Sequence, residues 1–142
     1  MNFYEQENNK TVLKTREIIR ELPEFCNEFF LDLNQNTLPK TRMGYAYDLR
    51  VFFNFLVTEN KEFLGRDIKS LTLDDLQKIK VVDINQFMDY LAYYVSDEDS
   101  QLYSNGENGK ARKLAAVRKL FKYFYRTEKI SSNPAELTIT PK

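Results

Sequence analysis

The 142-residue sequence contains no histidine, no tryptophan and a single cysteine, Cys26. Without histidine, no Ser–His or Cys–His nucleophile pair can form, and the His/Cys ligand sets of zinc sites are missing. A lone cysteine cannot form an internal disulfide, which is typical of a protein from a reducing cytoplasm. Its neighbours Phe25, Phe29 and Phe30 indicate a small core residue. We therefore predict a cytoplasmic chain with no catalytic residue, no metal site and no cofactor.

Glycine and proline are also scarce, with four residues of each, which favours helices over a turn-rich β fold. No apolar run reaches 18 residues, so we expect no membrane span and no membrane partner. The polar start of the chain, MNFYEQENNK, has no signal-peptide apolar region. The polar segment 96–109 contains Asp97, Glu98 and Asp99 without the spacing of a calcium loop, and we interpret it as an exposed loop.

The net charge is zero, but the charges are unevenly distributed along the chain. Residues 1–100 carry 12 basic and 18 acidic side chains, whereas residues 101–142 carry 9 basic and 3 acidic side chains. A polarised molecule of this kind can bind an anionic partner through one region in spite of its overall neutrality.

The hydrophobic periodicity predicts an all-α fold, a compact bundle of four to six helices. Residues 1–20 form an N-terminal extension, with residues 1–10 loose and a short helix over 11–21. Residues 21–132 form the helical domain, and residues 133–142 resemble the start of an inter-domain linker. The expected helices of the domain cover residues 23–34, 39–58, 72–79, 82–96 and 108–126. For the helix at 72–79, Thr72 and Asp75 predict a capping box.

The helix over residues 39–58 has Pro39 in its first turn and a regular apolar face. That face comprises Tyr45, Leu49, Phe52, Phe53 and Leu56. Lys40, Thr41 and Arg42 cluster at its start, where free backbone amides and the positive end of the helix dipole favour an anion such as phosphate. Helix capping and an ordinary surface also explain these three residues.

The helix over residues 108–126 organises the rest of the chain. Asn105 or Asn108 can cap its start. Its apolar face comprises Leu114, Val117, Leu120, Phe121 and Phe124. At about 100° per residue, Arg112, Lys119 and Arg126 fall on the opposite side of the helix from Phe121. A basic face of this kind is either an ordinary solvated surface or a binding surface for an anion.

Two segments resemble a known family. The run Thr41-Arg42-x-x-Tyr45-x-x-Asp48-Leu49-x-x-Phe52 resembles the second helix of the SAM-like core-binding domain of tyrosine recombinases, the phage-integrase family. The run from Ala111 to Phe124, ARKLAAVRKLFKYF, resembles the last long helix of that domain. The closing Asn133-Pro134-Ala135 and Pro141-Lys142 resemble the exit into the catalytic domain. Xer-type recombinases are the most similar group.

The resemblance implies sequence-directed binding of double-stranded DNA by the N-terminal half of a clamp. It also implies two protein partners, namely a C-terminal catalytic domain of the same chain and other recombinase protomers on DNA. Carried over by position, the implied DNA contacts are Lys40, Thr41, Arg42, Lys110, Arg112, Lys113, Arg118 and Lys119. The family's catalytic residues lie in the C-terminal domain, so this segment is not an enzyme by itself.

Two other classes of protein fit the same pattern. One is a stand-alone helical transcription regulator, although its two basic helix starts would then lie unusually far apart in the sequence. The other is a helical protein–protein adaptor whose basic helix binds an acidic partner. Salt-sensitive DNA binding separates the adaptor from the other two classes.

Overall fold

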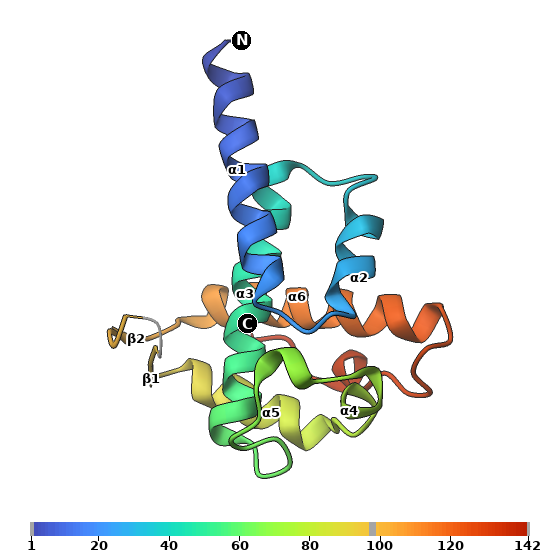
Figure 1. The fold of residues 1–142 in the computed structure, drawn as a ribbon. Coiled ribbons are helices and arrows are strands. Elements are labelled where there is room, and N and C mark those ends of the chain that lie inside the picture. Colours follow the sequence, from blue (N-terminus) through green and yellow to red (C-terminus); the bar gives the residue numbers. More distant parts are fainter. Residues whose placement is uncertain (1, 97–98, 142) are drawn as a thin grey trace.

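Six α-helices dominate the computed structural model, which describes residues 2–96 and 99–141 (Figure 1). The α-helices are α1 (Phe3–Arg20), α2 (Cys26–Leu33), α3 (Pro39–Glu59), α4 (Leu73–Gln77), α5 (Val81–Leu91) and α6 (Glu107–Arg126). Two 3₁₀ helices, η1 (Ile68–Ser70) and η2 (Pro134–Leu137), and two short strands, β1 (Tyr94–Val95) and β2 (Leu102–Tyr103), complete the described elements. The predicted all-α class is confirmed.

The core lies where α3, α5 and α6 meet, and α6 runs across α3 (Figure 1). Every predicted core residue of α6 and all but one of those of α3 are at most 1% exposed. The exception is Tyr45, which is half-buried at the edge of the core. Phenylalanine rings join the elements edge to face, for example Phe52 of α3 and Phe87 of α5, whose centroids are 5.1 Å apart. Such pairs add to the free energy gained by burying the rings.

Cys26 begins α2 and is fully buried within this core. Burial raises the pKa of its thiol far above the ordinary value, because the thiolate would lose its hydration there. The interpretation of Cys26 as a small core residue is confirmed.

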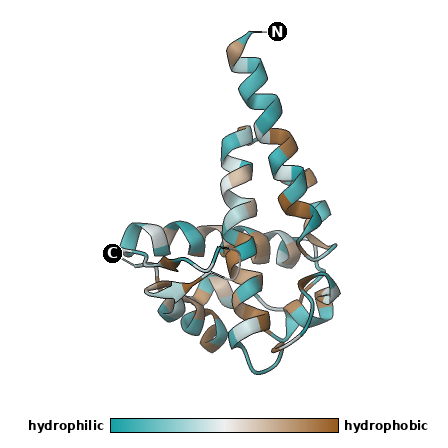
Figure 2. Ribbon diagram, turned by 60° about the vertical axis from the view of Figure 1, so that its left-hand side comes forward, coloured by the Kyte–Doolittle hydropathy of each residue, from teal (hydrophilic) through white to brown (hydrophobic). Residues whose placement is uncertain are grey.

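The helix α1 begins at Phe3, whereas the sequence predicted loose residues up to position 10. Asn2 caps its start, with its side-chain oxygen accepting a hydrogen bond from the Glu5 amide at 2.8 Å. Thr11 and Thr15 are buried, and each hydroxyl donates to the carbonyl four residues earlier in the helix. Two polar residues whose hydroxyls are satisfied within the helix therefore share its inner side with Ile18, and no hydrophobic pattern reveals them. The first turns of α1 project beyond the other helices and are mainly hydrophilic (Figure 2).

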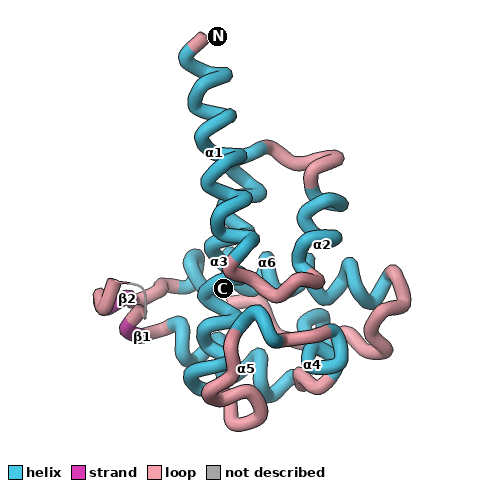
Figure 3. Tube along the Cα trace, in the orientation of Figure 1, coloured by secondary structure: helices cyan, strands magenta, loops and turns pink. Residues whose placement is uncertain are grey.

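A small hairpin lies between α5 and α6, where the sequence predicted helix and then loop (Figure 3). Its strands are antiparallel, with Tyr94 opposite Tyr103. The Tyr94 ring stacks on Tyr103 at a centroid distance of 5.6 Å and on Tyr90 of α5 at 4.8 Å. Helix α5 therefore ends at Leu91, and Val95, which lies within the predicted helix, is an exposed residue of β1. Of the predicted acidic loop, Asp97 and Glu98 lie outside the described residues.

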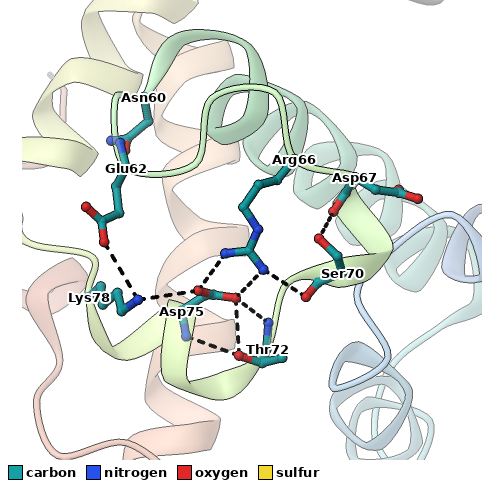
Figure 4. A network of polar contacts seen from close by, with 8 residues as sticks. All are labelled: Asn60, Glu62, Arg66, Asp67, Ser70, Thr72, Asp75 and Lys78. Atoms are coloured by element: carbon teal, nitrogen blue, oxygen red, sulfur yellow. Dashed lines mark hydrogen bonds and ion pairs between the residues drawn. The ribbon is translucent and has the colours of Figure 1, made fainter.

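The start of α4 has the predicted capping box (Figure 4). The Thr72 hydroxyl accepts a hydrogen bond from the Asp75 amide, and the Asp75 carboxylate accepts one from the Thr72 amide at 2.9 Å. Arg66 also donates two hydrogen bonds to this carboxylate, at 2.8 and 3.0 Å. The loop before α4 is thus attached to its first turn through Asp75.

Candidate nucleic-acid interface

The first turns of α6 meet α3 in its middle, near Asp48. Asp48 Oδ2 lies 3.7 Å from Arg112 Nε, so two segments far apart in the sequence become neighbours. Thr41 lies seven residues before Asp48 on the same face of α3, about 10 Å along the helix axis. The start of α6 therefore approaches the third turn of α3, not its first.

At the start of α3, Lys40 and Thr41 are exposed. Leu38 occupies the N-cap position and provides no side-chain hydrogen bond, and the first turn carries no acidic residue. The positive end of the helix dipole is therefore not compensated by a side chain of the first turn. Arg42 is half-buried, and its guanidinium donates a hydrogen bond to the Thr37 carbonyl at 2.5 Å. Lys40 and Thr41 are thus the more accessible pair of the three predicted contacts.

Helix α6 begins at Glu107 with Gly106 as its N-cap residue, so neither Asn105 nor Asn108 caps it as predicted. Asn105 instead joins the end of α5 to α6. Its amide nitrogen donates to the Leu91 carbonyl at 2.8 Å, and its oxygen accepts a hydrogen bond from Lys113 Nζ at 2.8 Å. This bond holds Lys113 against the protein, where it is 6% exposed. The structure therefore does not present Lys113 as a surface cation.

The other two cations near the start of α6 differ in exposure. Lys110 is half-buried and forms an ion pair with Glu107 at 3.6 Å. The Arg112 side chain is 67% exposed although its Nε lies near Asp48. Arg112 is thus the most accessible of the three predicted contacts in this turn of the helix.

Asp48 is the residue at this crossing that sequence reasoning did not assign to the site. It is 4% exposed, and burial raises its pKa, an effect that the charges of Arg112 and Lys113 partly oppose. Burial likewise lowers the pKa of Lys113, against the attraction of Asp48. The position of Asp48 beside Leu49, one turn before Phe52, was the available signal, because a carboxylate next to an apolar face requires a buried partner.

The two remaining predicted contacts, Arg118 and Lys119, are neighbours in α6 with different surroundings. Arg118 is half-buried and donates hydrogen bonds to Ala135, Thr138 and Thr140 near the end of the chain. Lys119 is exposed on the same side of α6 as Arg112, two helical turns further along. Lys122 and Arg126 continue this exposed basic stripe, and Arg126 forms an ion pair with Asp32 of α2 at 3.5 Å.

Two further features of the described part of the chain concern metal-binding groups and membrane-spanning helices. No group of three or more His, Cys, Asp or Glu side chains there is arranged to hold a metal ion. No helix in residues 2–96 and 99–141 is long and apolar enough to cross a membrane.

Comparison with known proteins identifies relatives of one kind. Tyrosine recombinase XerC of Caldanaerobacter subterraneus subsp. tengcongensis is 34% identical over 128 residues, which cover 85% of this chain and 33% of that protein. Tyrosine recombinase XerC of Chlorobaculum parvum is 34% identical over 112 residues, covering 79% of this chain and 29% of that protein. Tyrosine recombinase XerC of Leptospira interrogans is 27% identical over 132 residues, covering 86% of this chain and 36% of that protein. No family model matches the chain, and no solved structure matches it significantly.

These similarities confirm the resemblance that the two sequence motifs indicated. The chain spans about one third of the length of the curated relatives that it matches. This chain is therefore related to the XerC-type tyrosine recombinases, which it matches over about one third of their length.

Proposed function

We propose that this chain binds duplex DNA as the N-terminal half of the clamp of a site-specific tyrosine recombinase. In this proposal residues 21–132 are the core-binding domain, and residues 133–142 begin the linker to a catalytic domain of the same chain. The full-length protein is then the recombinase, and its other partners are further protomers assembled on DNA. The similarity to XerC proteins supports this assignment.

The observation that carries the proposal is the exposed basic stripe on α6. Arg112, Lys119 and Lys122 are all exposed on the side of the helix that faces away from the core. Thr41 lies on the same face of α3 as Asp48, which Arg112 of α6 approaches, and this supports a shared contact surface. Side chains of this kind neutralise phosphates and release counterions, and arginine can also read guanine.

The test is a titration of fluorescent duplex DNA with the 142-residue chain at several salt concentrations. We expect affinity to fall steeply with salt, because each phosphate contact contributes about 0.9 to the slope of log affinity against log salt. Lys119→Gln and Lys40→Gln should each make this slope shallower, reducing its magnitude by about 0.9. Lys61→Gln is the matched control, because it removes one exposed positive charge just beyond the C-terminal end of α3.

The same titration separates the proposed DNA-binding function from the alternative of a protein–protein adaptor. A chain that does not bind duplex DNA even at low salt contradicts the proposal and favours a protein-binding module. Equal losses of DNA affinity for Lys61→Gln and Lys119→Gln would show that binding depends on the net charge of the chain and not on the stripe on α6.

A further inference from the structure

The side chain of Arg118 forms hydrogen bonds with residues near the end of the described chain. Its Nε donates to the Ala135 carbonyl at 3.2 Å, and its Nη1 donates to the Thr140 hydroxyl at 2.5 Å. Its Nη2 donates to the Thr138 carbonyl. All three nitrogens of one guanidinium therefore bind residues of the segment 135–140, which lies far from Arg118 in the sequence.

This segment has an inner and an outer side. Ala135 and Thr138 are buried, whereas Leu137 and Ile139 are 72% and 86% exposed. Within η2 the segment also supports itself, since the Thr138 amide donates to the Ala135 carbonyl. Beyond the end of η2, Thr138 and Thr140 both reach Arg118, so the arginine fixes the path of the chain where the 3₁₀ helix no longer does.

Arginine suits this task for a physical reason. Its planar guanidinium offers five donors in a fixed fork, so it can bind several acceptors at once with little further loss of side-chain freedom. Three of its nitrogens are already used here, which leaves few donors for a phosphate. The adjacent Lys119 differs in this respect, because it is exposed on the outer face of α6.

We propose that Arg118 is a positioning residue, which sets the direction in which the chain leaves the helical domain and does not contact DNA. The consequence for recombination rests on the proposed function, because the exit direction then orients the following domain relative to the DNA-facing side of α6. The attachment of residues 135–140 to Arg118 is independent of that function and can be tested without DNA.

The experiment measures the distance between two spin labels in the 142-residue chain. The labels are placed at Ala115→Cys, which is exposed on α6, and at Ile139→Cys, which is exposed on the exit segment. Cys26 stays unlabelled because its thiol is buried. We expect a narrow distance distribution in the parent chain and in Lys119→Gln, and a broad distribution in Arg118→Gln.

The same two variants are compared for duplex DNA binding at several salt concentrations. Arg118→Gln should leave the salt slope unchanged, whereas Lys119→Gln should lower it by about 0.9. A narrow distribution in folded Arg118→Gln, or a salt slope lowered by about 0.9 in that variant, overturns the proposal. If no variant binds DNA, the proposed function fails while the distance measurement still decides the role of Arg118.

A second variant covers the case in which Arg118→Gln does not fold, as judged by circular dichroism. Thr140→Val removes an acceptor from an exposed residue of the segment and leaves α6 intact. This variant should also broaden the distribution measured from Ile139→Cys. An unchanged narrow distribution would then overturn the proposal.

Discussion

Asp48 of α3 and Arg112 of α6 approach to 3.7 Å at the crossing of the two helices, with Asp48 buried and Arg112 largely exposed. Burial raises the pKa of Asp48, so the folded state holds its proton more tightly than the unfolded state does. The contribution of Asp48 to the free energy of unfolding must therefore decrease as the pH rises from the ordinary value of 3.8 through the raised pKa.

The corresponding prediction compares the parent chain with Asp48→Asn in urea unfolding between about pH 3 and pH 7. The free energy of unfolding of the parent, relative to the variant, should fall with rising pH and level off above the raised pKa. A difference that rises with pH would show that attraction to Arg112 and Lys113 outweighs the loss of hydration.

Asp75 provides the opposite case, because the hydrogen bonds from Arg66, followed by those from Thr72, lower its pKa (Figure 4). Its contribution to stability is fully present above the ordinary value of 3.8 and is lost as the pH falls through the lowered pKa. Asp75→Asn should lower the free energy of unfolding by about 1–3 kcal/mol near neutral pH. The loss should shrink in acid, and a loss that is constant with pH would contradict the assignment.

Lys113 and Lys119 permit a matched comparison on one helix. Lys113→Gln should lower the free energy of unfolding by about 1–3 kcal/mol, because the partly buried Asn105 oxygen loses its donor and Asp48 loses a nearby charge. Lys119→Gln changes an exposed side chain and should alter stability by less than about 0.5 kcal/mol. Thermal unfolding, monitored by circular dichroism, measures the stability of both variants. Equal losses of stability would show that Lys113 is not buried in solution.

The same pair of variants also differs in DNA binding. Lys119→Gln should lower the salt slope for duplex DNA by about 0.9, and Lys113→Gln should leave it unchanged under conditions where the variant is folded. An effect of Lys113→Gln equal to that of Lys119→Gln would instead mean that α6 rearranges on DNA and releases Lys113.

The apolar faces of α3 and α6 could be predicted because each depends only on spacing within one helix. Leu49, Phe52 and Phe121 are buried as the helical period requires. The flanks of α6 could not be predicted in this way. Lys113 faces Asn105, and Arg118 faces residues 135–140, which lie elsewhere in the sequence.

Two features at the edges of the fold, the buried threonines of α1 and the hairpin, also depend on contacts that leave no periodic pattern in the sequence. Thr11 and Thr15 of α1 are buried although they are polar, because their hydroxyls bond to carbonyls of their own helix. The hairpin has two residues in each strand, too few for an alternating pattern, and depends on the stacking of Tyr94 between Tyr90 and Tyr103. Pairings of this kind arise from tertiary structure and have no periodic signal.

Phe121 tests the packing of α6 on the core most directly. Its ring is completely buried, and alanine would leave a cavity that the surrounding helices can only partly fill. Phe121→Ala should therefore lower the free energy of unfolding by about 3–5 kcal/mol, measured by urea unfolding. Tyr125→Ala is the matched control, because Tyr125 is an aromatic residue of the same helix that is 48% exposed. This variant should lower the free energy of unfolding by less than about 1 kcal/mol. A loss for Phe121→Ala as small as that of Tyr125→Ala would show that α6 turns a different face to the core, and the exposed stripe of Arg112 and Lys119 would then be misplaced as well.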